Sequence, residues 1–438
     1  MQRLTKLLGF SSSMESMRVY FTLHSGRNAT VFFTLVLMDI KESSGYRDFM
    51  WAVEIHRLSL EMLGLWPKDV MVSVRSLWSE LHASIILILL IFVCNVPTIC
   101  TIIKVWGDMV LVIDNLRLML PLLIASVKYV IMRWKRTVLL SIVNMMAEDW
   151  MAFKSDAERA VMIRRARTAR LIMIIGYAFI LISLLIITVP TYFGIQVLHI
   201  GNLTKQSKPL PLETYHFYDT DKSPQFELTF FFHVLTMLLA STTYMAVDIF
   251  LLLIILHICG QLENFRYRLI SLVSCKNFNK SLNDIVVFHL RLIKFANYIE
   301  NTYCLMMLIM IFHFAIVFCL SGFLFTIILN ERKINEAIII QIFHSIFFII
   351  ILLMNTFFYC GAGELVMEQC NAVHRGMCNL EWYKLESRKA RNLILLMIRA
   401  NHPFPISAGK IIPLTMATFC SILKTSCGYI SFLLTKHG

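Results

Sequence analysis

Seven stretches of this chain are apolar over about 20 residues, the length that an α-helix needs to cross the hydrocarbon core of a bilayer. The chain is 58% hydrophobic and 16% charged, with a mean hydropathy of +0.69, so a soluble fold would lack the polar surface to cover itself. We therefore predict an all-α membrane protein with seven transmembrane helices. The predicted spans are Leu81–Val105, Met109–Trp134, Leu171–Leu198, Glu227–His257, Thr302–Leu329, Ala337–Cys360 and Ile412–Leu434.

Lysine and arginine are distributed unevenly between the segments that connect these spans. Nine precede the first span, and ten, six and seven lie in the second, fourth and sixth connections with their flanking helix ends. The other three connections and the tail together hold only seven. Because basic connections stay in the cytosol, the N-terminus is predicted to be cytosolic and the C-terminus extracellular. The net charge of +13 then belongs to the cytosolic face, and no nucleic-acid partner is expected.

Cysteines and glycosylation sequons agree with this topology. None of the 11 cysteines lies in a predicted external loop, at 106–108, 199–226 or 330–336, so no extracellular disulfide framework is expected. The sequon at Asn202 lies in the external third loop, where it is a candidate glycosylation site. The sequons at Asn28 and Asn279 lie on the predicted cytosolic side and are treated as chance matches.

The N-terminal part divides at Met38. Residues 1–37 contain an apolar run too short to span a membrane, and we predict a disordered extension or a gene-model artefact there. Residues 38–80 are predicted to be a cytosolic amphipathic segment that could lie along the membrane surface. Its expected apolar positions are Phe49, Val53, Leu58, Met62 and Leu65.

The predicted cytosolic segments are long and have a helical pattern. Glu148–Arg170 alternates basic and apolar residues, and Cys259–Glu300 and Gly361–Arg399 continue neighbouring spans in helical register. Such helices must pack against one another or against other subunits. We expect residues 81–360 to hold spans one to six with their cytosolic extensions, and residues 361–411 to form a cytosolic anchor helix. Residues 412–438 are then the last span and the tail.

Motifs for catalysis are not found. The chain has no phosphate-binding glycine loop, no His-Glu-x-x-His and no nucleophile elbow. Cys370, His374 and Cys378 share one helical face and could hold a soft metal, but a packed helix face explains them better. We expect no metal, no cofactor and no enzymatic activity.

Charges inside predicted spans are informative because each is costly in lipid. Asp114 and Arg117, three residues apart, can neutralise each other, whereas Asp248 is placed near the inner interface. Only Arg117 and Lys424 are counted as basic residues inside spans, and Lys424 has no partner on its own helix.

The last predicted span is amphipathic. One stripe of small and polar positions recurs at spacings of three and four, and it comprises Thr418, Ser421, Thr425, Gly428, Phe432 and Thr435. Close packing of small residues against another helix explains this stripe, and so does a water-filled path surrounded by several copies of the helix. The pattern alone leaves both explanations open.

The two ends of the chain resemble those of the insect odorant receptors. Leu63-Gly64-Leu65-Trp66-Pro67 is similar to the N-terminal motif of that family. The C-terminal signature is matched at Trp382-Tyr383, Arg388-Lys389, Arg399, Pro403, Ala408-Gly409-Lys410, Pro413-Leu414, Thr418-Phe419, Leu423-Lys424, Ser426, Tyr429 and Leu433-Leu434. Cys427 stands where a Tyr is common and Gly428 where a Ser is common. The residues after Gly428 favour this family over the related gustatory receptors.

The resemblance implies an odorant-gated, non-selective cation channel in the plasma membrane of olfactory sensory neurons. Its partners would be a shared co-receptor subunit, a small volatile odorant and membrane lipid. The polar stripe would line the pore, with Lys424 beside it at a subunit contact. The family's odorant pocket lies in the outer half of each subunit, and topology places eight residues there: Ile113, Leu116, Thr188, Tyr192, His233, Met237, Phe343 and Phe347. Tyr192 and His233 are the expected hydrogen-bond partners of the ligand.

Two other functions have seven or more membrane helices. A metabotropic G-protein-coupled receptor has the opposite orientation, and this chain lacks its Asp-Arg-Tyr and Asn-Pro-x-x-Tyr motifs. A secondary transporter would show broken helices and a midplane ion site.

Overall fold

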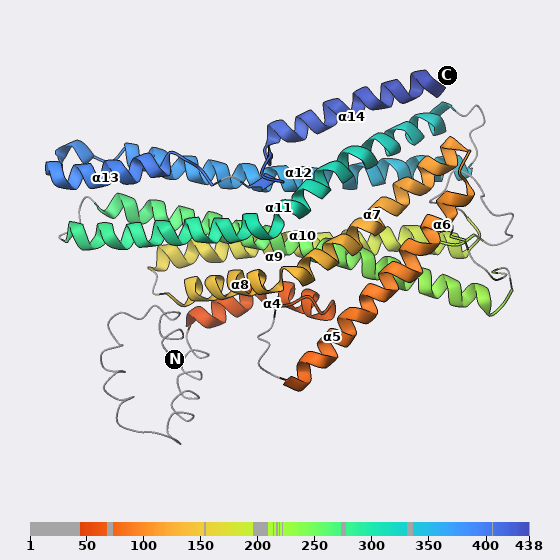
Figure 1. The fold of residues 1–438 in the computed structure, drawn as a ribbon, viewed down its shortest axis with the longest axis horizontal. Coiled ribbons are helices and arrows are strands. Elements are labelled where there is room, and N and C mark those ends of the chain that lie inside the picture. The colour runs from red at the N-terminus through yellow and green to blue at the C-terminus, as the bar shows by residue number, and fades with distance from the viewer. Residues whose placement is uncertain are drawn as a thin grey trace.

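The molecule is an elongated bundle of helices that lie roughly along one axis (Figure 1). The computed structural model describes residues 44–67, 73–152, 155–195, 209–212, 214–215, 218, 220, 222–272, 277–330, 336–404 and 406–437. We call the end that holds α13 (Ser387–Ala400), the end of α10 (Gln225–Leu272) and the start of α11 (Phe278–Asn330) the charged end. The opposite end, with residues 105–108 and 192–195, is the loop end.

The helices begin with α4 and end with α14, and two strands of two residues each precede the last helix. Their bounds are α4 Ser44–Met62, α5 Ser73–Ile88, the π-helix η1 Leu89–Asn95, α6 Val96–Lys104, α7 Met109–Trp134, α8 Arg136–Met151, α9 Asp156–Tyr192, α10 Gln225–Leu272, α11 Phe278–Asn330, α12 Glu336–Cys378, the 3₁₀-helix η2 Trp382–Lys384, α13 Ser387–Ala400, β1 Ser407–Ala408, β2 Ile412–Pro413 and α14 Met416–His437. The all-α fold class is as predicted from the sequence.

Six helical stretches of the described chain are long and apolar enough to cross a membrane. They correspond to the first six predicted spans, and those of α9, α10, α11 and α12 continue well beyond the membrane length, as the helical pattern of the connections predicted. The seventh predicted span is α14, whose polar stripe and Lys424 lower its hydropathy. With 22 residues, α14 is about 33 Å long, which is enough to cross the hydrocarbon core.

The first span is irregular, where the sequence suggested one continuous helix. α5 passes into the π-helix η1, and Pro97 follows at the start of α6. Proline lacks a backbone N–H, and π-turns leave helical carbonyl groups without their usual donors. The side chain of Asn95 compensates: its Nδ2 donates to the Leu90 carbonyl at 2.8 Å and to Ser126 Oγ on α7 at 2.7 Å.

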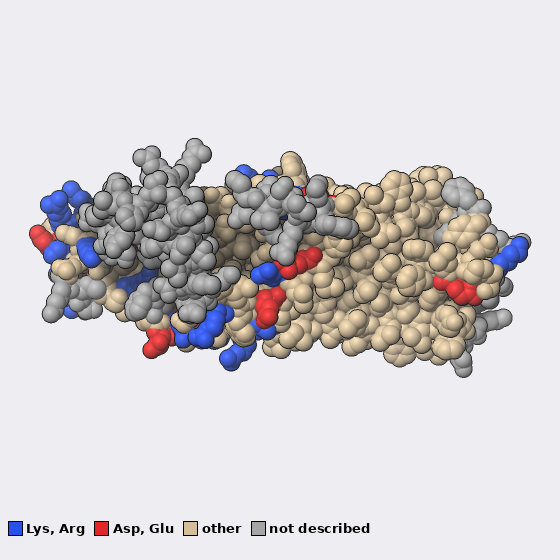
Figure 2. All heavy atoms as spheres, turned by 90° about the horizontal axis from the view of Figure 1, so that it is seen from below, with Lys and Arg blue, Asp and Glu red and all other residues tan. Residues whose placement is uncertain are grey.

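Charged side chains are concentrated toward one end of the molecule. Figure 2 shows Lys, Arg, Asp and Glu over the charged end and the middle, then a broad band without charged side chains, then a few charges at the loop end. Many large hydrophobic side chains of the membrane-length helices are exposed, so we call this the apolar band. In a membrane protein, such a band is the surface that lipid covers.

Ion pairs join different helices at the charged end. Arg268 of α10 binds Glu158 of α9 at 2.6 Å, and Asp149 of α8 accepts from His257 of α10 at 3.0 Å and from Arg291 of α11 at 2.8 Å. Burial alone would raise the pKa of Asp149, but the hydrogen bonds and charges of His257 and Arg291 hold that pKa below its ordinary value. The charged end is therefore cross-linked by side chains far apart in the sequence.

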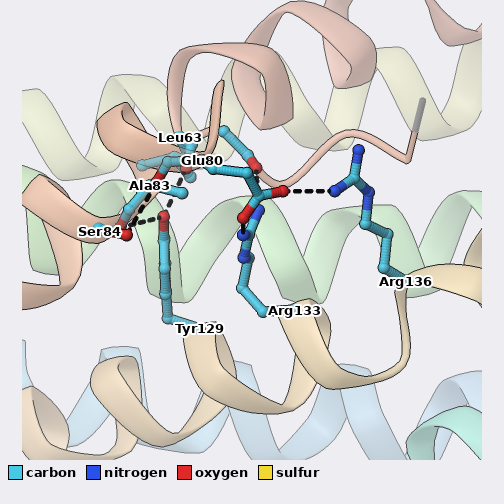
Figure 3. Close-up of polar contacts among 8 residues, drawn as sticks. Leu63, Glu80, Ala83, Ser84, Tyr129, Arg133 and Arg136 are labelled. Carbon is cyan, nitrogen blue, oxygen red and sulfur yellow. Dashed lines mark hydrogen bonds and ion pairs between the residues drawn. The ribbon is translucent and has the colours of Figure 1, made fainter. Parts of the chain in front are cut away.

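The N-terminal motif forms a clamp between α4, α5 and α7 (Figure 3). Gly64 has φ +66°, a conformation that glycine adopts without strain, and the turn exposes backbone carbonyl groups to α7. Tyr129 donates to the carbonyl oxygens of Leu63 at 2.9 Å and Ala83 at 3.0 Å. Arg133 donates to the Gly64 carbonyl at 3.3 Å and also binds Glu80.

α4 is amphipathic, but its buried face differs in part from the predicted one. Phe49, Val53 and Leu65 are buried as expected, whereas Leu58 and Met62 are 59% and 65% exposed. The face formed by Phe49, Ala52, Val53, His56 and Leu60 packs on helices of the bundle, principally α8 and α9. α4 thus packs on protein along one side.

The prediction of a single anchor helix over 361–411 is wrong. α12 continues from the apolar band to Cys378, a turn with η2 follows, and α13 runs as a separate helix to Ala400. The chain then turns back through residues 401–404 to the strands β1 and β2.

Candidate pore face and ligand cavities

The start of α14 is held by a short strand pairing and by polar contacts with two neighbouring helices. β1 pairs with β2 in an antiparallel register, Ser407 with Pro413 and Ala408 with Ile412, through a turn at Gly409 with φ +65°. The Ser407 backbone N–H donates to Glu300 of α11 at 3.1 Å. The Met416 N–H donates to Glu364 of α12 at 3.1 Å, which places a carboxylate at the helix N-terminus, where the dipole favours it.

One face of α14 packs on α11. Ile422 and Ser426 are buried, Ser426 Oγ contacts the Ala315 carbonyl at 3.5 Å, and the absence of a side chain on Gly322 makes room for Ile430. Phe419 also meets Phe357 of α12 edge-to-face with ring centroids 6.0 Å apart. This face fixes the rotation of α14 about its axis.

The opposite face of α14 is not covered by the described part of this chain. Figure 1 shows α14 along one edge of the bundle, beside α11. Of the predicted stripe, Ser421, Thr425, Gly428, Phe432 and Thr435 are exposed, and Thr418 is half-buried with its hydroxyl donating to the Pro413 carbonyl at 2.7 Å. Nothing lies within 4 Å of a Cβ built on Gly428. Lys424 is exposed on the same side of the helix.

The eight residues predicted for the odorant pocket lie in the half of the apolar band nearer the loop end, on α7, α9, α10 and α12, but in different surroundings. Ile113 is buried against Phe323 and Leu324 of α11, and Leu116 and Thr188 are half-buried on α7 and α9. Tyr192 and Phe343 are 60% and 70% exposed, and Tyr192 meets Phe230 edge-to-face.

His233 and Phe347 each line a cavity, and the cavities are separate ones. His233 is 1% exposed, contacts Thr214 at 3.2 Å and borders a cavity of about 490 Å³ together with residues of η1, α6 and α10. Met237 follows one turn later on α10 and is half-buried. We call this space the His233 cavity. The described residues do not bring the eight positions together around one space.

A second cavity, of about 330 Å³, lies between α9, α10 and α12, and it is the one that Phe347 lines. Of its 20 lining residues, only Asp248, Asn355 and Tyr359 carry polar side chains, so we call it the Asp248 cavity. Leu414, two residues before α14, also lines it. An apolar space with a few convergent polar groups is the usual form of a small-molecule site.

Two ion pairs are buried within the apolar band. Arg117 and Asp114 pair at 2.9 Å on α7, with side chains 2% and 0% exposed, as the spacing suggested. The second pair was missed: Lys128 of α7 binds Asp248 of α10 at 2.5 Å, and Tyr359 of α12 donates to the same carboxylate oxygen.

This second pair corrects two assignments made from the sequence. Lys128 was counted with the second connection, yet its side chain is 1% exposed inside the bundle, and Asp248 is a buried partner rather than an interfacial residue. Lys128 also lies 3.4 Å from the ring centroid of Tyr244, a cation–π contact. A lysine six residues inside a predicted span was the available signal, but its partner is 120 residues away in the sequence.

Some of the predicted features lie outside the described residues, and one predicted cluster does not form a site. Residues 1–37, the glycosylation candidate Asn202 and most of the third and fifth connections lie outside the described residues. Cys378 Sγ lies 3.6 Å from His374 Nε2 on α12, but no group of three possible metal ligands occurs among the described residues.

Two insect odorant receptors are similar in sequence to part of this chain. Odorant receptor 10 of Aedes albopictus is 26% identical over 163 residues, 36% of this chain and 40% of that protein. Odorant receptor 13a of Drosophila melanogaster is 24% identical over 247 residues, 52% of this chain and 58% of that protein. These alignments therefore cover less than two thirds of either relative.

A solved structure matches the fold over most of its length. The insect olfactory receptor OR5 of Machilis hrabei, in complex with eugenol, superimposes with a TM-score of 0.73 at 16% identity, covering 89% of this chain and 99% of that one. The family described as 7tm Odorant receptor matches residues 108–427, well over half of the chain. This chain therefore belongs to the odorant receptor family of seven-helix membrane proteins.

Proposed function

We propose that this protein is a subunit of an odorant-gated, non-selective cation channel that acts with a shared co-receptor. The observation that carries the proposal is the face of α14 with Ser421, Thr425 and Gly428, which is polar, lies in a membrane-length helix and is uncovered by the described chain. Polar groups do not face lipid without a partner, so this face must meet water or another subunit. Several copies of α14 around an axis would supply both.

Lys424 has a separate place in this arrangement. It lies beside the stripe of Thr418, Ser421, Thr425, Gly428, Phe432 and Thr435 that lines the pore in the proposal. A lysine in the narrowest part of the pore would repel cations. We place its ammonium at a polar contact with the neighbouring subunit or at a wide part of the water-filled path.

The charged end is the cytosolic end in this proposal. Basic residues there retain that end in the cytosol, which makes the N-terminus cytosolic and the C-terminus extracellular. Lipid of the plasma membrane of olfactory sensory neurons would cover the apolar band. This orientation is opposite to that of a metabotropic receptor.

The odorant binds in the half of the band nearer the loop end. His233 is buried beside a cavity there, and Tyr192 lies on the adjoining end of α9, so both remain the proposed hydrogen-bond partners. Eugenol, the ligand named for the OR5 structure, is a small phenol with an apolar body, which is a suitable probe for such a space. The ligand shifts the gating equilibrium only by as much as it binds the open state better than the closed state.

The test is whole-cell current in cells that express this chain with and without the co-receptor during application of an odorant panel that includes eugenol. We expect rapid cation current only in cells that express both. Current from this chain alone would contradict the need for a co-receptor. Suppose that no current is recorded with or without the co-receptor, although the protein reaches the surface and a positive-control receptor responds. This result would contradict the channel assignment for that panel.

Orientation is tested independently of ligand. An epitope at the C-terminus should be reached by antibody on intact cells, and one at the N-terminus only after permeabilisation. The reverse result would favour the metabotropic alternative.

A further inference from the structure

We propose that the seam between α4 and α9 binds the headgroup of an anionic phospholipid at the edge of the apolar band. Arg167 and Arg170 of α9 hold the phosphate, and Trp51 of α4 supports Arg170. The acyl chains lie over exposed apolar side chains of the same two helices. This site goes beyond the proposed channel function, and only its placement in the cytosolic leaflet rests on the orientation proposed with that function.

The outer face of α9 changes from basic to apolar within about one helical turn. Arg167, Leu171 and Ile174 follow one another at spacings of four and three, so they lie on one side of the helix, and all three are exposed. α9 is a membrane-length helix that runs from the charged end through the apolar band (Figure 1). The change between Arg167 and Leu171 therefore marks the level at which lipid headgroups meet the protein.

α4 accompanies this face of α9 into the apolar band. Its Ser59 side chain contacts the Tyr177 hydroxyl of α9, which lies beyond Leu171 in the direction of the loop end. Leu58, which is 59% exposed, is therefore level with the apolar part of α9. Trp51 lies about two helical turns earlier in α4, at the level of the headgroups, where tryptophan is common in membrane proteins.

Most arginines at the start of α9 are already neutralised by carboxylates of other helices. Arg164 and Arg165 both bind Glu263 of α10, at 2.5 Å and 2.9 Å. Arg159 binds Asp48 of α4 at 2.6 Å. Two arginines nearer the apolar band have no such partner within the described part of the chain.

The first of these is Arg167, which is exposed and makes no ion pair or side-chain hydrogen bond with a described residue. The second is Arg170, whose one hydrogen bond is to the Trp51 backbone carbonyl. Glu54, an exposed carboxylate of α4 one turn after Trp51, forms no ion pair with either arginine. The seam therefore carries uncompensated positive charge at the headgroup level.

Arg170 is held in a way that leaves most of its donors available. Its guanidinium carbon lies 4.6 Å from the centroid of the Trp51 ring, a cation–π contact. Stacking on the indole fixes the plane of the guanidinium, and its remaining N–H groups can donate to phosphate oxygens in pairs. This arrangement prepares the side chain for a phosphate before the ligand arrives.

Charge and the adjoining apolar surface together determine the ligand class. The two arginines favour a ligand with net negative charge, and Leu171, Ile174 and Leu58 beside them favour one with an apolar part. An anionic phospholipid such as phosphatidylserine has both. Free phosphate has no apolar part, and phosphatidylcholine would bring a further cation to the arginines. Anionic lipids belong to the cytosolic leaflet, the side on which the proposed orientation places the charged end.

The test uses the full chain with its co-receptor in phosphatidylcholine nanodiscs. The probe is a trace of photoreactive phosphatidylserine with a diazirine in one acyl chain, and the matched probe is phosphatidylcholine with the same photoreactive chain. Mass spectrometry should place the phosphatidylserine on α9 between Leu171 and Ile175 and on α4 around Leu58. The phosphatidylcholine should label these peptides about 5- to 25-fold less, because each basic residue near a membrane surface contributes a factor of about five.

Two double variants locate the site. Arg167→Gln with Arg170→Gln should lower labelling by phosphatidylserine to the level of phosphatidylcholine. The matched control is Arg388→Gln with Arg391→Gln, which removes the same charge from exposed positions of α13 at the charged end. This control should leave labelling unchanged.

A competition experiment distinguishes a lipid from a free phosphate compound. Unlabelled phosphatidylserine should compete with the probe, whereas soluble glycerophosphoserine, which has the same headgroup without acyl chains, should not. Competition by the soluble compound would overturn the assignment to a lipid.

The other results are equally decisive. Equal labelling by the two photoreactive lipids would overturn the anionic class. A preference that survives in the α9 double variant, or disappears in the α13 control, would overturn the site. If the α9 double variant fails to fold, Arg167→Gln alone decides, since Arg167 contacts no described polar group: it should lower labelling about fivefold, and no change would overturn the site.

Failure of this site and failure of the proposed function remain distinguishable, because nanodiscs present the probe in both leaflets. Labelling as expected in a chain with the reverse epitope orientation would support the site and contradict the cytosolic placement of the charged end. Labelling as expected in a chain without odorant current would support the site and contradict the channel function.

Discussion

Two of the helix faces that the described part of this chain leaves uncovered differ in chemistry. The outer face of α9 presents Leu171, Ile174, Phe179, Ile182 and Leu185, all large, apolar and exposed. The outer face of α14 presents Ser421, Lys424, Thr425 and Gly428, also exposed but small or polar. Both helices run through the apolar band, so burial alone does not distinguish them.

The difference indicates which solvent each face meets. Lipid covers the apolar face of α9 without further interactions, because it has no polar group to satisfy. The face of α14 would be costly in lipid, and it requires water or a polar partner. The comparison thus separates the lipid surface of the protein from the surface that lines the ion path in the proposed assembly.

The largest expected effect compares two lysines inside membrane helices. Lys128→Met leaves the buried Asp248 carboxylate without its ion-pair partner, and it should destabilise the fold by about 3–5 kcal/mol. Lys424→Met removes an exposed charge and should change stability by less than about 0.5 kcal/mol. Fluorescence size-exclusion after heating in detergent measures both.

A double variant, Lys128→Met with Asp248→Asn, controls for the loss of side-chain packing. It should recover part of the stability, because no unpaired charge remains. An equal loss of stability for Lys128→Met and Lys424→Met would mean that α14 does not have an open face.

The second prediction places the same charge on each face. Ile182→Asp puts a carboxylate on the lipid side of α9 near mid-membrane, at a cost of about 2.5–3.5 kcal/mol for insertion. Thr425→Asp puts it on the polar face of α14, where water is proposed to solvate it. Surface biotinylation should show a strong loss for Ile182→Asp and near-normal protein for Thr425→Asp; comparable losses would remove the distinction between the faces.

The smallest effect compares two glycines: Gly322 of α11 lies in the contact with α14, and Gly428 lies on the uncovered face of α14. A Cβ at Gly322 would meet the side chain of Ile430, so Gly322→Ala should cost about 1–3 kcal/mol from overpacking. A Cβ at Gly428 meets nothing within 4 Å, so Gly428→Ala should gain about 0.5–1 kcal/mol from helix propensity. Thermal stability of the two variants in detergent measures the difference, and a loss for Gly428→Ala would indicate a covered face.

Much of the fold follows from local sequence. Apolar runs and their continuation in helical register predicted the spans and their long extensions, because both depend on neighbouring residues. The π-helix η1 and the division of the predicted anchor helix into α12, η2 and α13 were not predicted. They depend on how Asn95, Ser126 and other residues far apart in sequence meet in space.

The candidate sites also differ in whether a local sequence pattern or the packing of distant segments determines them. The stripe of α14 was visible as a helical period, and Asp114 with Arg117 as a local spacing. Lys128 with Asp248, and the cavity beside them, require that α7, α10 and α12 be placed side by side, which no local pattern specifies. The odorant positions were chosen by depth alone, and depth does not determine which side of a helix faces a cavity.

The most direct measurement of the central claim is cysteine accessibility during odorant-evoked current. Thr425→Cys and Ile182→Cys would be compared in a background with Cys420→Ser and Cys427→Ser, since both native thiols are exposed on α14. A charged, water-soluble thiosulfonate should block current through the Thr425→Cys channel and leave Ile182→Cys unaffected, because only the first thiol faces water. No block at Thr425→Cys, with current intact and a loop-end cysteine shown to react, would contradict the claim that this face of α14 lines the ion path.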